Sequence, residues 1–126
     1  DAQILSEAFR VLRAGGWILV DVADAAAVRT SFSSIAWHEI GDEVVVCRQR
    51  EIQEPFICAR EIVLSKSNGL IRDQNYAIRM YDAVGLSELL ANCGYCQISV
   101  HTEFSPYETD GDYGFMNNRM MAIGQK

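Results

Sequence analysis

The 126-residue sequence lacks the features that would place a protein in a membrane or on a nucleic acid. No apolar run approaches the length of a membrane span, and no segment has the pattern of a signal peptide. The formal net charge is −6, and Arg48, Arg50 and Arg60 are interleaved with glutamates instead of forming a basic patch. We therefore expect no membrane and no nucleic acid as a partner.

Internal repeats and low-complexity segments are also absent, and hydrophobic residues make up 49% of the chain. That share excludes a disordered tail, and the length suits one domain with its own core. Because the chain does not begin with methionine, we expect a fragment, a processed product or a partial reading frame. The prediction is a single partial domain over residues 1–126.

The four cysteines show neither a disulfide framework nor a zinc pattern. Cys93 and Cys96 form a C-x-x-C pair, which is typical of disulfide oxidoreductases when it follows a strand and opens a helix. Here the pair is predicted to close a helix and open a strand, so the helix dipole has the wrong sign for thiol activation. Cys47 and Cys58 lack the paired spacing of zinc ligands. We expect four free thiols in a reducing cytoplasm.

Other candidate groups for chemistry are isolated along the chain. His38 and His101 lie in predicted strands and could act as general bases near neutral pH, but a surface or structural role is the preferred interpretation of both. Asp110 and Asp112 flank a glycine as in a calcium loop, whose remaining ligands are missing. The sequence therefore predicts no metal site and assigns no catalytic residue.

The most informative segment that is present covers residues 5–22, LSEAFRVLRAGGWILVDV. Its first part is an amphipathic helix, which ends at a glycine pair because glycine adopts left-handed conformations at little cost. Residues 17–22 are almost wholly apolar, which predicts a strand buried on both faces. Asp21 and Asp24 lie at its carboxyl end, the edge where open α/β sheets bind ligands. The apolar positions on one face of the helix are Ile4, Leu5, Ala8, Phe9 and Leu12.

The middle third of the sequence is typical of an antiparallel meander. Ser67, Asn68 and Gly69 form a strong hairpin-turn signal, since asparagine and glycine tolerate positive φ. Three alanines at 25–27 belong to a short helix or loop that follows the first strand. The strand-like segments are 34–40, 43–52, 56–65 and 70–79.

Three segments carry a resemblance to a known family. RVLRAGGWILVDV resembles the RVLKPGG-plus-strand segment of class I methyltransferases that use S-adenosylmethionine, with Ala14 in place of the usual proline. Residues 77–95, AIRMYDAVGLSELLANCGY, are similar to the family's R-x-Y, helix and glycine-aromatic segment. Residues 96–101 and 119–124 resemble its sixth and its last, antiparallel, sheet strands. The apolar face of the short helix consists of Leu86, Leu89 and Leu90.

The resemblance implies an α/β fold, the C-terminal part of a Rossmann-like methyltransferase sheet with an inserted antiparallel β-meander as a cap. It divides the chain into 1–33 (helix plus sheet strand), 34–79 (cap strands) and 80–126 (helix and two closing sheet strands). The implied reaction transfers a methyl group from S-adenosylmethionine to an acceptor, which the charge of the chain suggests is a small molecule. The substrate-binding candidates are Trp37, Arg79, Tyr81, Phe104 and Tyr107.

A purely structural interpretation of these candidates is open as well. Arg79 would then form a structural ion pair, and the aromatic residues would fill the core between cap and sheet. The family's cofactor site needs a glycine-rich turn after the first strand and an acidic residue after the second, whereas the glycine pair here precedes its strand. We therefore assign no cofactor-binding residue and expect that the chain alone does not bind S-adenosylmethionine by the family's route.

Three hypotheses follow from the sequence. The chain is the C-terminal half of a methyltransferase, or a non-catalytic binding or interaction module derived from that fold, or an enzyme of another class that uses the C-x-x-C pair. A truncated sheet would expose an edge and apolar faces, so we also expect self-association.

Overall fold

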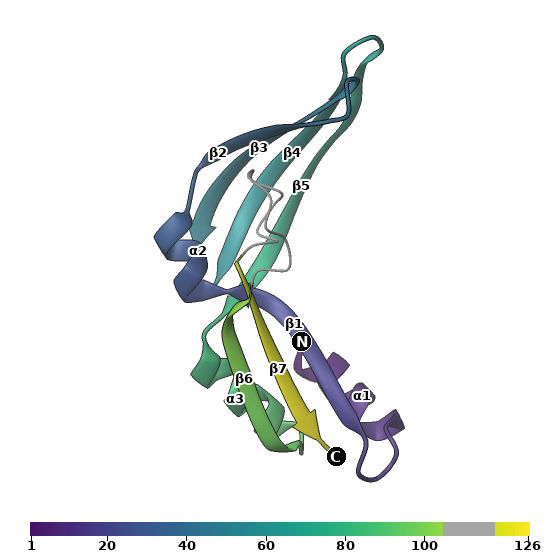
Figure 1. Cartoon of the computed structure of the whole chain (residues 1–126), viewed down its shortest axis with the longest axis vertical. Helices are drawn as coiled ribbons and strands as arrows, with labels where there is room; N and C mark the ends of the chain where they lie inside the picture. The colour runs from purple at the N-terminus through teal and green to yellow at the C-terminus, as the bar shows by residue number, and fades with distance from the viewer. Residues whose placement is uncertain (105–117) are drawn as a thin grey trace.

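The computed structural model describes residues 1–104 and 118–126 of the chain (Figure 1). Within these residues the seven strands form one sheet, in the order β2-β3-β4-β5-β1-β7-β6. No helix in this part of the chain is long and apolar enough to cross a membrane. The elements are α1 (Ala2–Val11), β1 (Trp17–Asp24), α2 (Ala25–Ser31), β2 (Ile35–Ile40), β3 (Val44–Gln53), β4 (Phe56–Ser65), β5 (Gly69–Tyr81), α3 (Ala83–Asn92), β6 (Cys96–Phe104) and β7 (Arg119–Gln125).

The predicted helix, glycine pair and strand form α1, a tight turn and β1. Gly15 has a φ of +76°, and a β-carbon at Gly16 would lie 2.8 Å from the carbonyl oxygen of Arg13. The turn therefore has no space for a side chain at its second glycine. This compact turn lets the chain reverse and lay β1 against the helix it has just left.

The strand β1 joins the two parts of the sheet. It pairs antiparallel with β7 along seven residues, and β6 follows β7 at the outer edge. On its other side β1 pairs with β5, in parallel, only at Ala23–Met80 and Asp24–Tyr81. Residues 17–22 of β1 thus have no strand partner on that side among the described residues.

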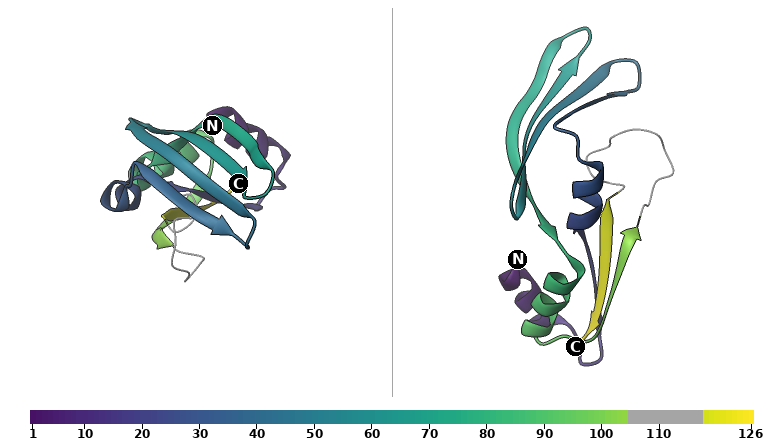
Figure 2. Two further views of the ribbon diagram at one scale, coloured as in Figure 1. Left: turned by 90° about the horizontal axis from the view of Figure 1, so that it is seen from above. Right: turned by 90° about the vertical axis from the view of Figure 1, so that its left-hand side faces the viewer.

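The prediction that β1 is buried on both faces is wrong. Ile18, Val20 and Val22 pack into the core, whereas Trp17 is 51% exposed and Leu19 is 64% exposed. The reason is that α1 and α3 both cover the same face of the β1–β7–β6 sheet, as Figure 2 shows. Two of the apolar residues in β1, Trp17 and Leu19, therefore face outward.

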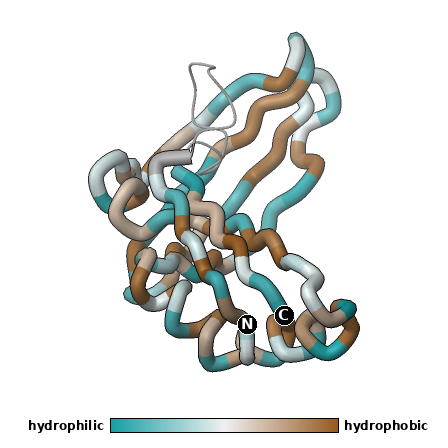
Figure 3. Tube along the Cα trace, turned by 60° about the horizontal axis from the view of Figure 1, so that its bottom comes forward, coloured by the Kyte–Doolittle hydropathy of each residue, from teal (hydrophilic) through white to brown (hydrophobic). Residues whose placement is uncertain are grey.

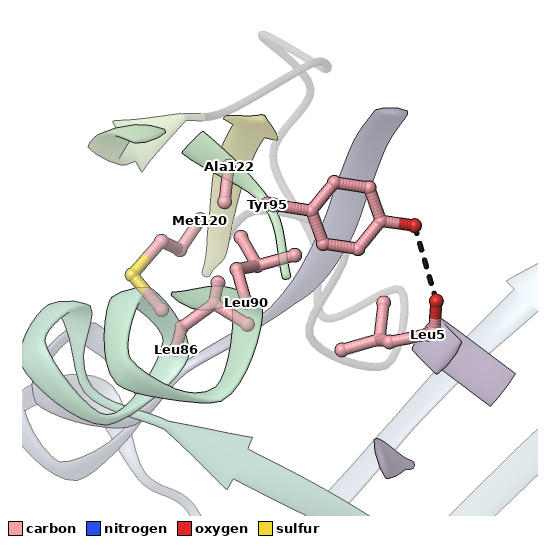
Figure 4. Close-up of a cluster of buried hydrophobic side chains, with 6 residues drawn as sticks. All are labelled: Leu5, Leu86, Leu90, Tyr95, Met120 and Ala122. Carbon is pink, nitrogen blue, oxygen red and sulfur yellow. Dashed lines mark hydrogen bonds between the residues drawn. The ribbon is translucent and has the colours of Figure 1, made fainter. Parts of the chain in front are cut away.

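The main core lies between that sheet and the two helices (Figure 4). Phe9 of α1 packs edge-on against Tyr95, with ring centroids 5.1 Å apart. The expectation that Ile4 shares the buried face of the helix is wrong, because only Leu5 of α1 is fully buried and Ile4 is 71% exposed. The buried side chains of this core are Leu5, Leu86, Leu90, Tyr95, Met120 and Ala122.

The predicted meander is confirmed as the four antiparallel strands β2 to β5, here called the cap (Figure 1). A second core cluster attaches the cap to the rest of the molecule. In it Val28 of α2 packs with Ile57 of β4 and Met80 of β5. Ala23 belongs to this cluster and Val22 to the main core, so α2 lies on the opposite face of the sheet from α1 and α3.

Candidate functional site

An open cleft lies where the cap meets the carboxyl end of β1. It consists of two adjoining parts, of about 510 Å³ and 320 Å³, which share Asp1, Tyr81 and Leu89. The N-terminus of α1, the last residues of β5 and the start of α3 form its walls. The apolar residues that line the smaller part are Ile4, Leu5, Val20, Val22, Leu86 and Leu89.

Two side chains converge on one carboxylate oxygen at the mouth of this cleft. The hydroxyl of Tyr81 donates a hydrogen bond of 2.5 Å to Oδ2 of Asp1, and Nε of Arg79 lies 2.9 Å from the same oxygen. Arg79 and Tyr81 are alternate residues of β5, so their side chains leave the strand on the same face. Arg79 also lies over the ring of Phe56, 4.7 Å from its centroid.

This geometry fixes the orientation of both polar side chains. Burial raises the pKa of the Tyr81 phenol, and the positive charge of Arg79 opposes that shift, so Tyr81 is a neutral hydrogen-bonding group near pH 7. A cleft with an apolar floor and a few oriented polar groups at its mouth has the general character of a small-molecule site.

The other predicted substrate residues do not gather at this cleft. Trp37 lies on β2, at the far edge of the sheet, with β3 and β4 between it and β5. Phe104 is the last residue of β6, and its side chain lies outside the described residues. Tyr107 lies outside them entirely, as do Asp110 and Asp112.

Asp1 is the residue that sequence reasoning missed. Nothing in the pattern around it distinguishes it, because its partners are about 80 positions away. Arg79 forms an ion pair with Asp1, as the purely structural interpretation of Arg79 expected. The cleft around this pair also leaves room for a ligand.

The two aspartates at the end of β1 are engaged in structural contacts. Asp24 is almost fully buried, and its Oδ1 accepts hydrogen bonds from the backbone N–H groups of Ala26 and Ala27 at the start of α2. Asp21 accepts a hydrogen bond of 2.8 Å from Nε of Arg119. Asp24 therefore acts as the N-cap of α2, and β1 runs directly into that helix.

The direct transition from β1 into α2 bears on whether these residues could bind the methyl donor. A nucleoside cofactor of the family would need a glycine-rich turn between a strand and the following helix. In the described part of the chain, the β1–α2 junction has an aspartate cap instead, and Gly15 and Gly16 precede their strand. The described residues therefore do not fit S-adenosylmethionine in the way that the family binds it.

The cap holds a second cluster of charged side chains, on the face that α2 covers at its lower end. Nε of Arg48 lies 2.8 Å from one carboxylate oxygen of Glu61, and Arg72 donates to the other. Nδ1 of His38 lies 3.3 Å from the Nη1 atom of Arg48. Glu61 is buried, so this network is a structural element of the cap.

The cysteine pair has the arrangement that argues against thiol redox chemistry. Cys93 is the C-cap of α3 and Cys96 is the first residue of β6. The prediction that the pair closes a helix and opens a strand is confirmed. Among the described residues, no three His, Cys, Asp or Glu side chains lie close enough to hold a metal ion.

No protein-family model matches the chain, and no curated protein matches its sequence. Solved structures do match it. The CcbJ methyltransferase from Streptomyces caelestis aligns with 98% of this chain and 48% of its own, at a TM-score of 0.72 and 19% identity. CalS10 is an amino pentose methyltransferase from Micromonospora echinaspora that was solved with S-adenosylmethionine bound. It aligns with 99% of this chain and 50% of its own, at a TM-score of 0.63 and 11% identity.

The sugar N-methyltransferase KedS8 from Streptoalloteichus sp. ATCC 53650 also matches, over 99% of this chain and 48% of its own, at a TM-score of 0.61 and 16% identity. The chain therefore has the fold of the carboxyl-terminal half of class I methyltransferases that depend on S-adenosylmethionine. It spans about half the length of the solved structures that it matches.

Proposed function

We propose that this chain is the acceptor-side half of a methyltransferase that transfers a methyl group from S-adenosylmethionine to a small molecule. The observation that carries the proposal is the fold. The sheet β1–β7–β6, the helices α1 and α3, and the cap follow the methyltransferase arrangement along nearly the whole chain. The competing hypothesis is a binding module that uses the same fold without catalysis.

The acceptor site in this proposal is the cleft beside Tyr81. The solved structures include enzymes whose names specify an amino pentose and a sugar N-methyl transfer, which supports an amino-sugar-like acceptor. Such a molecule has apolar ring faces for the floor formed by Leu5, Val20 and Leu89. It also has hydroxyl groups that Tyr81 and Arg79 can bind in place of, or beside, Asp1.

The role of this chain in catalysis is to position the acceptor. Methyl transfer is an in-line displacement, so most of the rate enhancement comes from holding the nucleophile at the correct distance and angle in a site without water. Tyr81 and Arg79 come from one rigid strand and are linked through Asp1, which limits their motion. The methyl donor itself would have to be held by residues other than those described.

Nuclear magnetic resonance titration of the isotope-labelled chain tests both parts of the proposal. Glucosamine is expected to shift the amide signals of Tyr81 and Leu89 and to spare the cap tip near Gly41. S-adenosylmethionine is expected to cause no saturable shift. Saturable binding of S-adenosylmethionine to the chain alone would contradict the proposal that other residues hold the methyl donor. An unchanged Tyr81 signal with glucosamine would contradict the proposed acceptor site.

Two variants sharpen the acceptor test. Tyr81→Phe keeps the ring and removes the hydroxyl, so it should weaken glucosamine binding roughly 5- to 10-fold, as expected for one lost hydrogen bond. Arg60→Gln is a matched control, because Arg60 pairs with Asp73 on the cap, away from the cleft. Equal weakening by both variants would show that the binding is non-specific.

Catalysis is separated from mere binding by a chimera in which the amino-terminal half of CcbJ precedes this chain. If the chain is an acceptor-side half, the chimera should bind S-adenosylmethionine and form a methylated amino sugar. A chimera that binds S-adenosylmethionine and glucosamine but forms no product would favour the binding module.

A further inference from the structure

The turn between β4 and β5 contains Asn68 followed by Gly69, which is the only asparagine–glycine pair in the sequence. The turn lies at the far end of the cap from both chain termini (Figure 1). Figure 3 shows hydrophilic residues at the tips of the cap, beyond the more hydrophobic segments of the strands. Both residues of the pair are exposed, and neither lines the cleft or belongs to a core cluster. The proposed function therefore does not involve this pair.

The backbone around Gly69 is open. Gly69 has a φ of +83°, and a β-carbon built on it would have nothing within 4 Å. Because glycine has no side chain, its backbone nitrogen is also less shielded than that of any other residue. A reaction between this nitrogen and the side chain of Asn68 would thus meet little steric hindrance.

The contacts of Asn68 are weak points of the turn. Its backbone N–H donates to Oγ of Ser65 over 2.8 Å, and its side-chain Nδ2 donates to Oγ of Ser67 over 2.9 Å. The side-chain amide is thus held by an exposed hydroxyl. Gly69 pairs with Ser65 as the last register pair of β4 and β5, and the exposed end of a strand pair is where local opening costs least. Brief opening of this pair would free the nitrogen of Gly69.

We propose that Asn68 is a site of spontaneous deamidation, which converts the turn into one with aspartate or isoaspartate. Solvent base takes the proton of the Gly69 backbone N–H, and the nitrogen attacks Cγ of Asn68. The bond between Cγ and Nδ2 breaks, ammonia leaves, and a five-membered succinimide forms. Water then opens the ring at Cγ, which gives aspartate, or at the backbone carbonyl carbon, which gives isoaspartate. Base and water are the only other reactants, and nothing is oxidised or reduced.

The product would change the hydrogen bonds around Glu43. Hydrogen bonds from Ser65 and Ser67 lower the pKa of Glu43 to about 2, so this carboxylate is ionised at neutral pH. The hydroxyl of Ser67 accepts from Nδ2 of Asn68 and donates to Glu43. A carboxylate at position 68 cannot donate to Ser67, and it places a second negative charge near that of Glu43. Isoaspartate also adds a methylene to the backbone and shifts the pairing of Gly69. Deamidation should therefore loosen the tip of the cap.

Peptide mapping of the whole chain, incubated in its folded form at mildly alkaline pH, tests the proposal. Trypsin cuts after Lys66 and Arg72 and releases residues 67–72, in which Asn68 has the only side-chain amide. This peptide should gain the mass difference between a hydroxyl and an amino group. It should also divide into two chromatographic peaks, for aspartate and isoaspartate. A sample taken before the incubation corrects for deamidation during digestion.

The internal control is Asn75 in the tryptic peptide 73–79, an exposed asparagine that precedes Tyr76 within β5. Asn68 should deamidate several-fold faster than Asn75. Asn68→Gln, which would need a larger ring, should leave its peptide unchanged over the same time. Equal rates at Asn68 and Asn75 would overturn the proposal. A rate at Asn68 that rises in urea in proportion to the unfolded fraction would overturn it too, because the folded turn would then protect Asn68.

A double-mutant cycle tests the predicted effect on the cap. Asn68→Asp mimics one product and should lower the midpoint of thermal unfolding. The loss should be smaller when Glu43→Gln removes the repelling charge. Asn68→Ser is the matched control, since it removes the amide without adding a charge, and it should lower the midpoint less than Asn68→Asp. An equal loss from Asn68→Asp with Glu43 and with Gln at that position would overturn the predicted link to Glu43.

Discussion

The hydroxyl of Tyr95 donates a hydrogen bond of 3.1 Å to the backbone carbonyl oxygen of Leu5 (Figure 4). The two residues are 90 positions apart, and the bond ties α1 to the segment between α3 and β6. Both residues belong to the main core. The contact therefore fixes the first helix against the last part of the sheet.

This bond predicts a graded effect of substitution at Tyr95. Tyr95→Phe removes the bond but leaves the carbonyl of Leu5 within its helix, so the free energy of unfolding should fall by only about 1 kcal/mol. Tyr95→Ala also leaves a cavity beside Phe9 and should cost about 3–5 kcal/mol. Urea unfolding followed by circular dichroism measures both. Equal losses for the two variants would show that packing contributes nothing beyond the hydrogen bond.

Gly94 and Gly41 form a matched pair for the cost of close packing. Both have positive φ, but a β-carbon at Gly94 would lie 3.0 Å from the ring of Phe9, whereas nothing lies within 4 Å of one at Gly41. Gly41→Ala should cost about 1 kcal/mol for the backbone conformation alone. Gly94→Ala should cost about 1–3 kcal/mol more through overpacking. Thermal unfolding of the two variants would contradict this account if Gly41→Ala were the less stable.

The charged cluster of the cap predicts different effects for a buried and an exposed pair. The side chains of Arg48 and Glu61 are 11% and 8% exposed, so Glu61→Gln removes the charge that a buried arginine faces and should cost about 3 kcal/mol. The pair of Arg60 and Asp73 is largely exposed, and Asp73→Asn should cost less than about 1 kcal/mol. Chemical denaturation of both variants compares the two costs directly.

Glu43 predicts a dependence of stability on pH. Hydrogen bonds from the side chain of Ser65, and from the side chain and backbone of Ser67, lower the pKa of the Glu43 carboxyl from 4.5 to about 2. Because the folded state has the lower pKa, the stabilisation is complete above the unfolded pKa near 4.5. It is lost as the pH falls from there toward 2.

Thermal unfolding between pH 2 and pH 6 checks this expectation, since Glu43→Gln should flatten part of the acid-side loss of stability. Glu54 and Asp73 also have lowered pKa values, through hydrogen bonds from Arg29 and Arg60, so the variant should not flatten the whole curve. An identical pH profile for wild type and Glu43→Gln would refute the assignment. The carboxyl resonance of Glu43 reports the same titration directly.

Much of the fold could be predicted from local pattern. The helix, glycine turn and strand at residues 5–22, the four cap strands and the short helix before Gly94 all depend on periodicity and turn residues close in sequence. The strands β2 to β5 accordingly lie within a few residues of the predicted ones. The order of these segments also carried the family resemblance, which the match with solved methyltransferases supports at the level of fold.

The wrong predictions concern burial, which depends on packing partners that the local sequence pattern does not specify. The apolar run of β1 suggests burial on both faces, but Leu19 is exposed because both helices pack on the side of Ile18. Similarly, Ile4 shares a helical face with Leu5 by spacing, while the helix contacts the sheet mainly through Leu5 and Phe9. Burial depends on which elements pack against a face, and that is a property of the whole fold.

The residues of the candidate site likewise divide into those that the sequence predicted and those that it did not. Arg79 and Tyr81 were candidates because the family resemblance places them where the cap returns to the sheet, and β5 brings both to the mouth of one cleft. Their common partner, Asp1, has no sequence signal, because it lies about 80 positions before them in the chain. Trp37, in contrast, is 65% exposed on the edge strand β2, away from that cleft.

The sequence by itself determined the elements of this protein, their order and the position of its tight turns, because these follow from periodicity and from backbone preferences within a few residues. Only the tertiary structure decided which face of β1 is buried and that Asp1 meets Arg79 and Tyr81. Those outcomes depend on contacts between residues far apart along the chain, whose closeness is set by the packing of the whole sheet against its helices.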